Sequence, residues 1–152
     1  MTVHISKMTG KLEGFQAIST NTITNDYCNK QHIKGKQDGQ NICGDCYSHA
    51  MLNTYRKNMQ AALQRNSDLL SSRPLEPQEI PRVTNAMFRF NAHGELINMQ
   101  HLENLMAIVK DNPWCTFALW TKRVDLVFRW LRDNDKPKNL QLIYSNPKTS
   151  HL

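Results

Sequence analysis

Segments typical of β-strands alternate with segments typical of α-helices through most of this chain, and this alternation limits its fold more than any other feature. Strands that alternate with helices favour a parallel sheet with right-handed crossovers. Because 152 residues is a usual length for one domain, the sequence predicts a single α/β domain over residues 1–152, with the order β-α-β-α-β-α-β. Four such strands make a half-barrel (partial TIM-barrel-like), with a small open sheet as the alternative. We expect strands at 14–20, 83–91, 114–121 and 140–144, and helices at 46–66, 99–110 and 124–131.

The connections between these segments indicate where a site would form. Residues 21–45 are polar and contain Gly and Asn, which predicts a long loop after the first strand. Residues 67–82 contain three prolines, which exclude a helix through that segment. In parallel α/β folds, functional sites lie beyond the carboxyl ends of the strands. The long loop and the residues that follow the other strands are therefore expected to meet at one edge of the sheet.

Three of the four cysteines, Cys28, Cys43 and Cys46, fall in or just after the long loop in the pattern Cys-x14-Cys-x2-Cys. The chain has no stretch of about 18 apolar residues and no apolar N-terminal run, so neither a membrane span nor a signal peptide is expected. In a reducing cytosol, cysteines this close are more often metal ligands than disulfides. Two thiolates two residues apart can bind one metal ion or two corners of an iron–sulfur cluster. The spacing alone does not decide between a [4Fe–4S] cluster and zinc.

A zinc site needs a fourth ligand, and two histidines are available. His32 follows Cys28 by four residues and His49 follows Cys46 by three, so either would complete a tetrahedral site of three cysteines and one histidine. The fourth cysteine, Cys115, lies in an apolar segment far from the others. We expect it in the core, because a free cysteine behaves as a small apolar residue.

Polar residues beyond the second and third expected strands are further candidates. Glu95 is either a ligand for a cofactor amine or a base beside the cluster, or a surface charge at the turn before the next helix. Gly94 beside it favours a close backbone approach. His93 is expected to be hydrogen-bonded rather than a ligand. Lys122 and Arg123 are either an anion-binding pair near a helix N-terminus or ordinary solvated charges.

Two more expectations concern side chains on the strands and the overall charge. Trp120 and Tyr144 alternate with their neighbours, which favours packing in the core. The net charge of +6 could attract nucleic acid or an acidic partner. No motif of a known nucleic-acid-binding module accompanies this charge, so a solvated basic surface is the simpler interpretation.

The cysteine loop and the segment FRFNAHGEL resemble the radical S-adenosylmethionine superfamily. Those enzymes have a three-cysteine [4Fe–4S] loop after the first barrel strand and a glycine–glutamate motif after the second, which contacts the methionine amino group of the cofactor. The first gap between cysteines is fourteen residues here, whereas it is usually three in the superfamily. The resemblance implies S-adenosylmethionine as a second cofactor. The cofactor-binding candidates at this edge are Gly94, Glu95, Lys122 and Asn146.

Four blocks, ISTNTITNDYC, ICGDCYSHAML, FRFNAHGEL and FALWTKR, resemble the phage protein family known as gene product eighty-eight. This resemblance implies a viral protein made in the host bacterial cytoplasm, and it favours a cluster over zinc. It supplies no reaction.

We therefore expect a phage-encoded [4Fe–4S] protein with a redox, structural or regulatory role. Half a barrel leaves two open sheet edges and little wall to exclude water from a radical, which favours this role over an enzyme. One alternative is a radical enzyme that uses S-adenosylmethionine on an unknown substrate. The other is a zinc-stabilised module that binds nucleic acid or a host protein.

Overall fold

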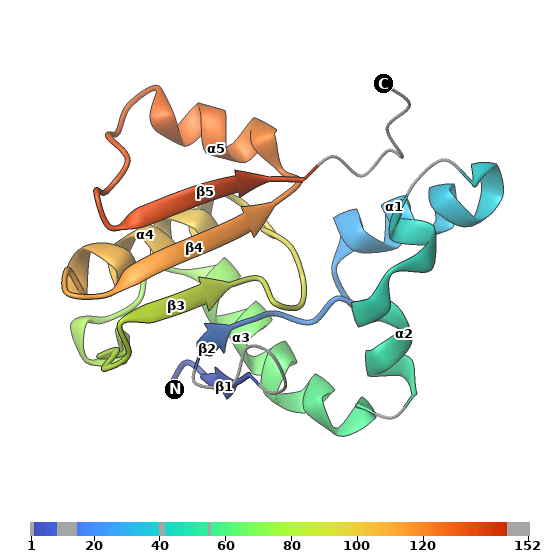
Figure 1. Cartoon of the computed structure of the whole chain (residues 1–152), viewed down its shortest axis with the longest axis horizontal. Helices are drawn as coiled ribbons and strands as arrows, with labels where there is room; N and C mark the ends of the chain where they lie inside the picture. The colour runs from blue at the N-terminus through green and yellow to red at the C-terminus, as the bar shows by residue number, and fades with distance from the viewer. Residues whose placement is uncertain (1, 9–14, 40–41, 55, 146–152) are drawn as a thin grey trace.

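The computed structural model describes residues 2–8, 15–39, 42–54 and 56–145, and its centre is a five-stranded mixed sheet (Figure 1). The strands lie in the order in which the chain makes them. The first pair is antiparallel and all the others are parallel. The strands are β1 (Ser6–Lys7), β2 (Gln16–Ile18), β3 (Met87–Phe90), β4 (Thr116–Thr121) and β5 (Leu140–Tyr144).

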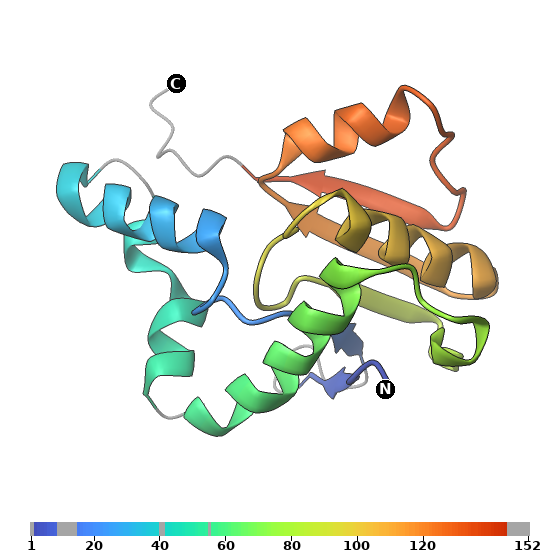
Figure 2. The same cartoon turned by 180° about the vertical axis from the view of Figure 1, so that it is seen from behind.

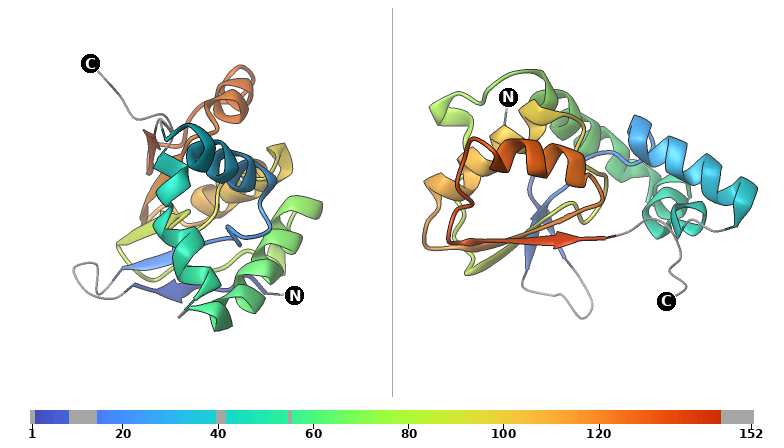
Figure 3. Two further views of the ribbon diagram at one scale, coloured as in Figure 1. Left: turned by 90° about the vertical axis from the view of Figure 1, so that its right-hand side faces the viewer. Right: turned by 90° about the horizontal axis from the view of Figure 1, so that it is seen from above.

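The helices form two groups. Those that connect the parallel strands, α3 (Gln60–Ser72), α4 (Met99–Asp111) and α5 (Val124–Leu131), cover one face of the sheet (Figures 2 and 3). The other two, α1 (Asp26–Asp38) and α2 (Tyr47–Asn53), lie beyond the carboxyl ends of the strands (Figure 1). Three short 3-10 turns complete the described structure: η2 (Ile42–Asp45), η3 (Lys57–Met59) and η4 (Pro77–Glu79).

The core lies between the sheet and the helices that cover it. Alternate residues of β3 and β4, including Phe88, Phe90 and Phe117, are buried against the helices. The rings of Phe90 and Phe117, on neighbouring strands, stack at 5.2 Å between centroids. Cys115, immediately before β4, is 1% exposed and belongs to this core, which confirms its expected place.

Two aromatic side chains of the sheet are more exposed than the sequence predicts. Trp120 is 41% exposed and Tyr144 is 42% exposed, so the expectation that both lie in the core is wrong. Trp120 alternates with buried Leu119 and Thr121, and therefore points away from α3, α4 and α5. Tyr144 ends the edge strand β5, and its ring meets that of Phe128, on α5, edge to face at 5.7 Å.

The α/β class and the parallel strands are confirmed, but the segment before them differs from expectation. Residues 21–45 are not a loop throughout, because α1 occupies half of that stretch. The expected helix at 46–66 is broken: α2 ends at Asn53, η3 follows, and α3 continues to Ser72. The helix thus runs six residues past its expected end and stops before Pro74, where proline prevents its continuation.

Two further features complete the fold. The strand β1 is too short to give a pattern in the sequence, and it extends the sheet beyond β2 in the antiparallel sense. In the part of the chain that the structure describes, no helix has the length and apolar character that crossing a membrane requires.

Candidate functional site

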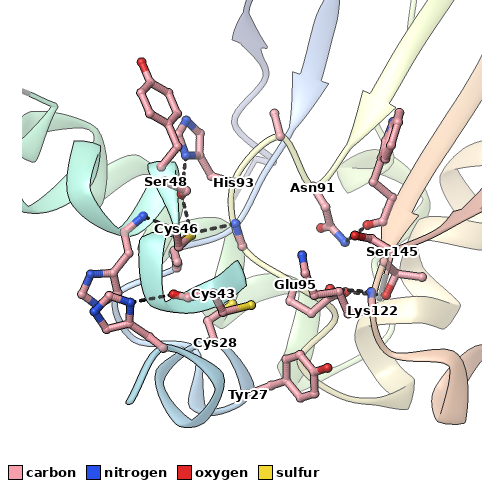
Figure 4. Close-up of a pocket in the computed structure, with 18 of the residues that line it drawn as sticks. Tyr27, Cys28, Cys43, Cys46, Ser48, Asn91, His93, Glu95, Lys122 and Ser145 are labelled. Carbon is pink, nitrogen blue, oxygen red and sulfur yellow. Dashed lines mark hydrogen bonds between the residues drawn. The ribbon is translucent and has the colours of Figure 1, made fainter. Parts of the chain in front are cut away.

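A cavity of about 270 Å³ lies between the carboxyl ends of the strands and the pair α1–α2. The three clustered cysteines line it from one side, and residues that follow β3, β4 and β5 line it from the other (Figure 4). The strand-end residues are Asn91, His93, Gly94, Glu95, Lys122 and Ser145. The structure therefore brings the expected candidates to one place, as the parallel topology predicts. Arg123 is not among the residues that line this cavity, and Asn146 lies outside the described residues.

Cys28 is positioned by the start of α1. The side-chain oxygen of Asn25, which caps the helix, accepts a hydrogen bond from the Cys28 backbone N–H at 2.9 Å. The amide nitrogen of the same side chain donates to the Glu95 carbonyl at 3.0 Å. One buried asparagine thus fixes the first cysteine relative to the segment after β3.

Cys43 is brought to the cavity by close packing between α1 and η2. Gly44 lies so near Gly35 that a Cβ atom on Gly44 would meet the backbone carbon of Gly35 at 2.6 Å. The Cys43 carbonyl also accepts a hydrogen bond from His32 Nδ1, on α1, at 2.7 Å. The glycine pair and this bond therefore hold the second cysteine against the helix that carries the first.

Cys46 caps the N-terminus of α2. Its sulfur accepts a hydrogen bond from the His49 backbone N–H at 3.4 Å. Its own N–H donates to the Cys43 carbonyl at 3.3 Å, so the two cysteines share one turn. Sequence reasoning expected a helix to begin here but did not identify the sulfur as its cap.

The three thiols line one side of the cavity but do not form a finished metal cage. Among the residues that the structure describes, no group of three or more histidine, cysteine, aspartate or glutamate side chains is arranged to hold a metal ion. None of the cysteines is in a disulfide.

Glu95 is buried, at 3% exposure, which rules out a surface charge. Its carboxylate accepts hydrogen bonds from the Leu96 N–H at 2.8 Å, the Lys122 N–H at 2.7 Å and the Thr121 hydroxyl. Burial raises the pKa of this carboxyl group, although the three donors and the Lys122 charge act against that shift. Glu95 therefore ties the segment after β3 to the turn between β4 and α5.

Gly94 makes the close approach that the sequence predicts. Its φ angle is +82°, and a Cβ atom would lie 2.1 Å from the Thr20 hydroxyl oxygen. Its N–H donates to the Thr22 hydroxyl at 2.8 Å. That hydroxyl is bonded to Ser48 at 2.6 Å, and Ser48 is bonded to His93 Nδ1 at 2.6 Å. His93 is thus hydrogen-bonded, as expected, within a network that joins α2 to the strand ends.

Burial and charge set the ionisation of the site. Burial raises the pKa of the Cys28 thiol, and Glu95 and the other two cysteines raise it further, while Lys122 lowers it. Burial likewise raises the pKa of Cys43, where Lys122 is the main opposing charge. Thiols in this state must lose protons before they bind a metal, and a nearby cation favours that loss. Lys122 is the described cation best placed for this role.

Sequence reasoning missed two residues that line the cavity, Tyr27 and Arg89. Tyr27 lines it, and burial followed by Glu95 raises its pKa to about 12. The Arg123 guanidinium lies over the Tyr27 ring at 5.1 Å and donates to the Leu96 carbonyl at 3.2 Å, so Arg123 is not simply solvated. Arg89, at the far side, reaches the cavity from β3. Burial, and then the charges of Arg89 and Arg56, lower the pKa of His93.

The chain matches the family model described as Gene product 88 over residues 19–152. No curated protein and no solved structure shows significant similarity to it. The match begins one residue after β2 and includes all three clustered cysteines together with the strand ends that face them. The chain therefore belongs to the phage gene product 88 family.

Proposed function

We propose that this phage protein holds a [4Fe–4S] cluster on Cys28, Cys43 and Cys46. The observation that carries the proposal is that three thiols from three separate elements line one cavity at the carboxyl edge of the parallel sheet. Bound there, the cluster would supply one-electron redox chemistry or a structural cross-link between α1, η2 and α2. We further propose that the sequential parallel strands form a half-barrel, with all three crossover helices on one face.

The residues around the thiols fit an anionic cluster in several ways. The backbone N–H that reaches Cys46 sulfur is the kind of donor that stabilises a bound thiolate and tunes a cluster. Lys122 supplies positive charge from the opposite wall. Because the thiols do not yet converge as a metal cage, cluster assembly requires their side chains to turn toward the cavity centre. Rotation between staggered rotamers provides such a movement.

His32 is the candidate for the fourth ligand. It lines the cavity, and its Nδ1 faces the Cys43 carbonyl at 2.7 Å. A carbonyl oxygen can only accept, so Nδ1 carries a proton and Nε2 is the nitrogen that would bind the metal. Metal-binding histidines commonly show this arrangement, in which the second ring nitrogen donates to a carbonyl. The His32 ring also stacks on that of His49, at 3.8 Å between centroids, which limits its rotation.

Glu95 favours a redox, structural or regulatory protein over an enzyme that uses S-adenosylmethionine. The resemblance assigns this carboxylate to the amino group of the cofactor. Here it already accepts three hydrogen bonds from its own chain, two from backbone N–H groups and one from a hydroxyl. All three hydrogen bonds are explained if Glu95 holds the segment after β3 against the turn between β4 and α5.

The ligand assignment is tested by replacing each cysteine separately with serine in protein purified without oxygen. We expect Cys28→Ser, Cys43→Ser and Cys46→Ser to lose most of the iron and the broad absorption near about 400 nm that thiolate-bound clusters give. Cys115→Ser is the matched control and should keep both, because that side chain lies in the core before β4.

One outcome would contradict the cluster assignment, and another would contradict only the non-enzymatic role. One is wild-type protein that contains one zinc ion per chain and takes up no iron, which would support the zinc-stabilised module. The other is a shift in the electron paramagnetic resonance spectrum of the reduced cluster when S-adenosylmethionine is added, which would support the radical enzyme.

A further inference from the structure

A second cavity, of about 450 Å³, opens on the face of the sheet opposite α3, α4 and α5. Its volume is in the range that small-molecule sites occupy. Arg89, Ala92 and His93 line both this cavity and the cysteine cavity, so the two are adjacent. None of the clustered cysteines lines it.

The floor of this cavity includes Ser6, Ala17 and Arg89, which belong to a row of paired residues across four neighbouring strands. Ser6 pairs with Ala17, Ala17 with Arg89, and Arg89 with Ala118. Paired residues on neighbouring strands point to the same face of a sheet. Arg89 therefore stands between two alanines, whose small side chains leave space beside its guanidinium group.

Arg89 is held in place but lacks a hydrogen-bond partner at one nitrogen. Its guanidinium carbon lies over the Trp120 ring, 5.2 Å from the ring centre, in a cation–π contact. Its Nε is buried and has no hydrogen-bond partner among the described residues, and the same is true of Ser6 Oγ. Buried polar atoms without partners are rare in native proteins, because each one costs free energy. Both of these atoms belong to residues that line the second cavity.

The charged side chains that line the second cavity are all positive among the described residues. Arg56 and Lys7 also line the cavity, and no aspartate or glutamate among the described residues does so. An arginine side chain presents parallel N–H groups that match the oxygens of a carboxylate or a phosphate. We propose that this cavity binds a small molecule through an oxyanion, with Arg89 Nε and Ser6 Oγ donating hydrogen bonds to it.

This site is distinct from the proposed cluster site, although it adjoins it. Arg89 and His93 face both cavities, so a ligand anchored at Arg89 would extend toward the cysteines. The exposed ring of Trp120 provides an apolar wall for the rest of such a ligand. Anion binding itself needs none of the cysteines and should persist in the full-length Cys46→Ser protein.

The proposal is tested by measuring the Tm of the full-length protein while chloride is replaced by inorganic phosphate, or by acetate, at constant ionic strength. A ligand that binds only the folded state stabilises it by RT ln(1 + L/Kd), where L is the free ligand concentration, so Tm rises with the logarithm of that concentration once it exceeds Kd. We expect such a rise with at least one of the two anions, and the anion that acts at lower concentration identifies a phosphate or a carboxylate ligand. Arg89→Gln should abolish the rise. Arg89→Lys keeps the charge but loses the Nε donor, and should weaken binding about tenfold or more.

Arg82→Gln is the matched control. Its guanidinium stacks on Trp114 at 5.3 Å, much as Arg89 stacks on Trp120, but it lies outside the second cavity. This variant should keep the wild-type response. If the Arg89 variants do not fold, nuclear magnetic resonance of the wild-type protein decides, because the Arg89 Nε–H signal should shift saturably with the same anion. An equal rise in Tm in wild-type and Arg89→Gln protein, or no rise in Tm together with no saturable shift of the Arg89 Nε–H signal, would overturn the proposal.

Discussion

Gly94 shows how one residue at the edge of the sheet sets the geometry of the whole site. It has a positive φ angle, and no side chain would fit between it and Thr20. Its neighbours on either side are His93, in the network to α2, and Glu95, in the network to the β4–α5 turn. A shift of the backbone at Gly94 would therefore move both walls of the cysteine cavity.

Gly94→Ala should lower the free energy of unfolding by more than about 2 kcal/mol, because it adds a steric clash to an unfavourable φ angle. Gly39→Ala is the matched control. Gly39 also has a positive φ angle, +68°, but a Cβ atom there would have no neighbour within 4 Å. Gly39→Ala should therefore lower the free energy of unfolding by only about 1–2 kcal/mol. Urea unfolding measures both, and equal losses would show that the contact with Thr20 does not matter.

His101 makes stability depend on pH through the start of α4. Its ring is buried, and Nδ1 accepts a hydrogen bond from the Ile97 N–H at 3.0 Å. Burial lowers its pKa to about 4. The unfolded chain, with a histidine pKa of about 6.5, binds a proton that the folded chain does not. The stabilisation is therefore complete above about pH 6.5 and is lost as pH falls toward 4, by roughly 3 kcal/mol in total.

His101→Asn keeps an acceptor for the Ile97 N–H but does not titrate in this range. We expect its free energy of unfolding to fall less steeply than that of the parent between pH 6.5 and 4. Both proteins would carry Cys46→Ser, so that loss of a cluster at low pH does not contribute. Parallel pH profiles for the two proteins would show that His101 is not responsible.

At the scale of elements, α1 is the clearest difference between the sequence prediction and the structure. Its residues are too polar for a pattern of buried positions, so periodicity predicted a loop. The residues at the two ends of α1 indicate the helix instead, because both are typical capping residues. Asn25 caps the first turn, and the Gly39 N–H bonds to the Gly35 carbonyl at the last. Capping residues could thus have identified α1, whereas its packing on η2 depends on a glycine contact that no local pattern reveals.

Gly44→Ala tests whether that contact brings the cysteines together. A methyl group at Gly44 would meet the Gly35 backbone at 2.6 Å and push η2 away from α1. The sheet core lies elsewhere, so the thermal unfolding transition should remain while the iron content of anaerobically purified protein falls severalfold. Ala50→Gly, on an exposed position of α2, is the control and should keep its iron. Normal iron content in Gly44→Ala would mean that the site forms without this contact.

For the whole molecule, strand–helix alternation predicted β2 to β5, their parallel direction and the edge where the candidate residues meet. It succeeded there because apolar side chains such as Phe88 and Phe117 must be buried against a helical layer. It failed for Trp120, because the pattern of one strand shows that two faces exist but not that helices cover only one of them. Arg89 lies on the same face of the sheet as Ser6 and contacts Trp120 because of the register of the strands, which brings together residues that are far apart in sequence.

The central claim is that three cysteines at the carboxyl edge of this sheet hold an iron–sulfur cluster. It is tested most directly by measuring iron, acid-labile sulfide and zinc per chain in wild-type protein purified without oxygen. The account predicts about four iron and four sulfide per chain, with no stoichiometric zinc, as a [4Fe–4S] cluster requires. Protein that contains zinc at one ion per chain, and that remains free of iron and sulfide after reconstitution with both, would contradict it.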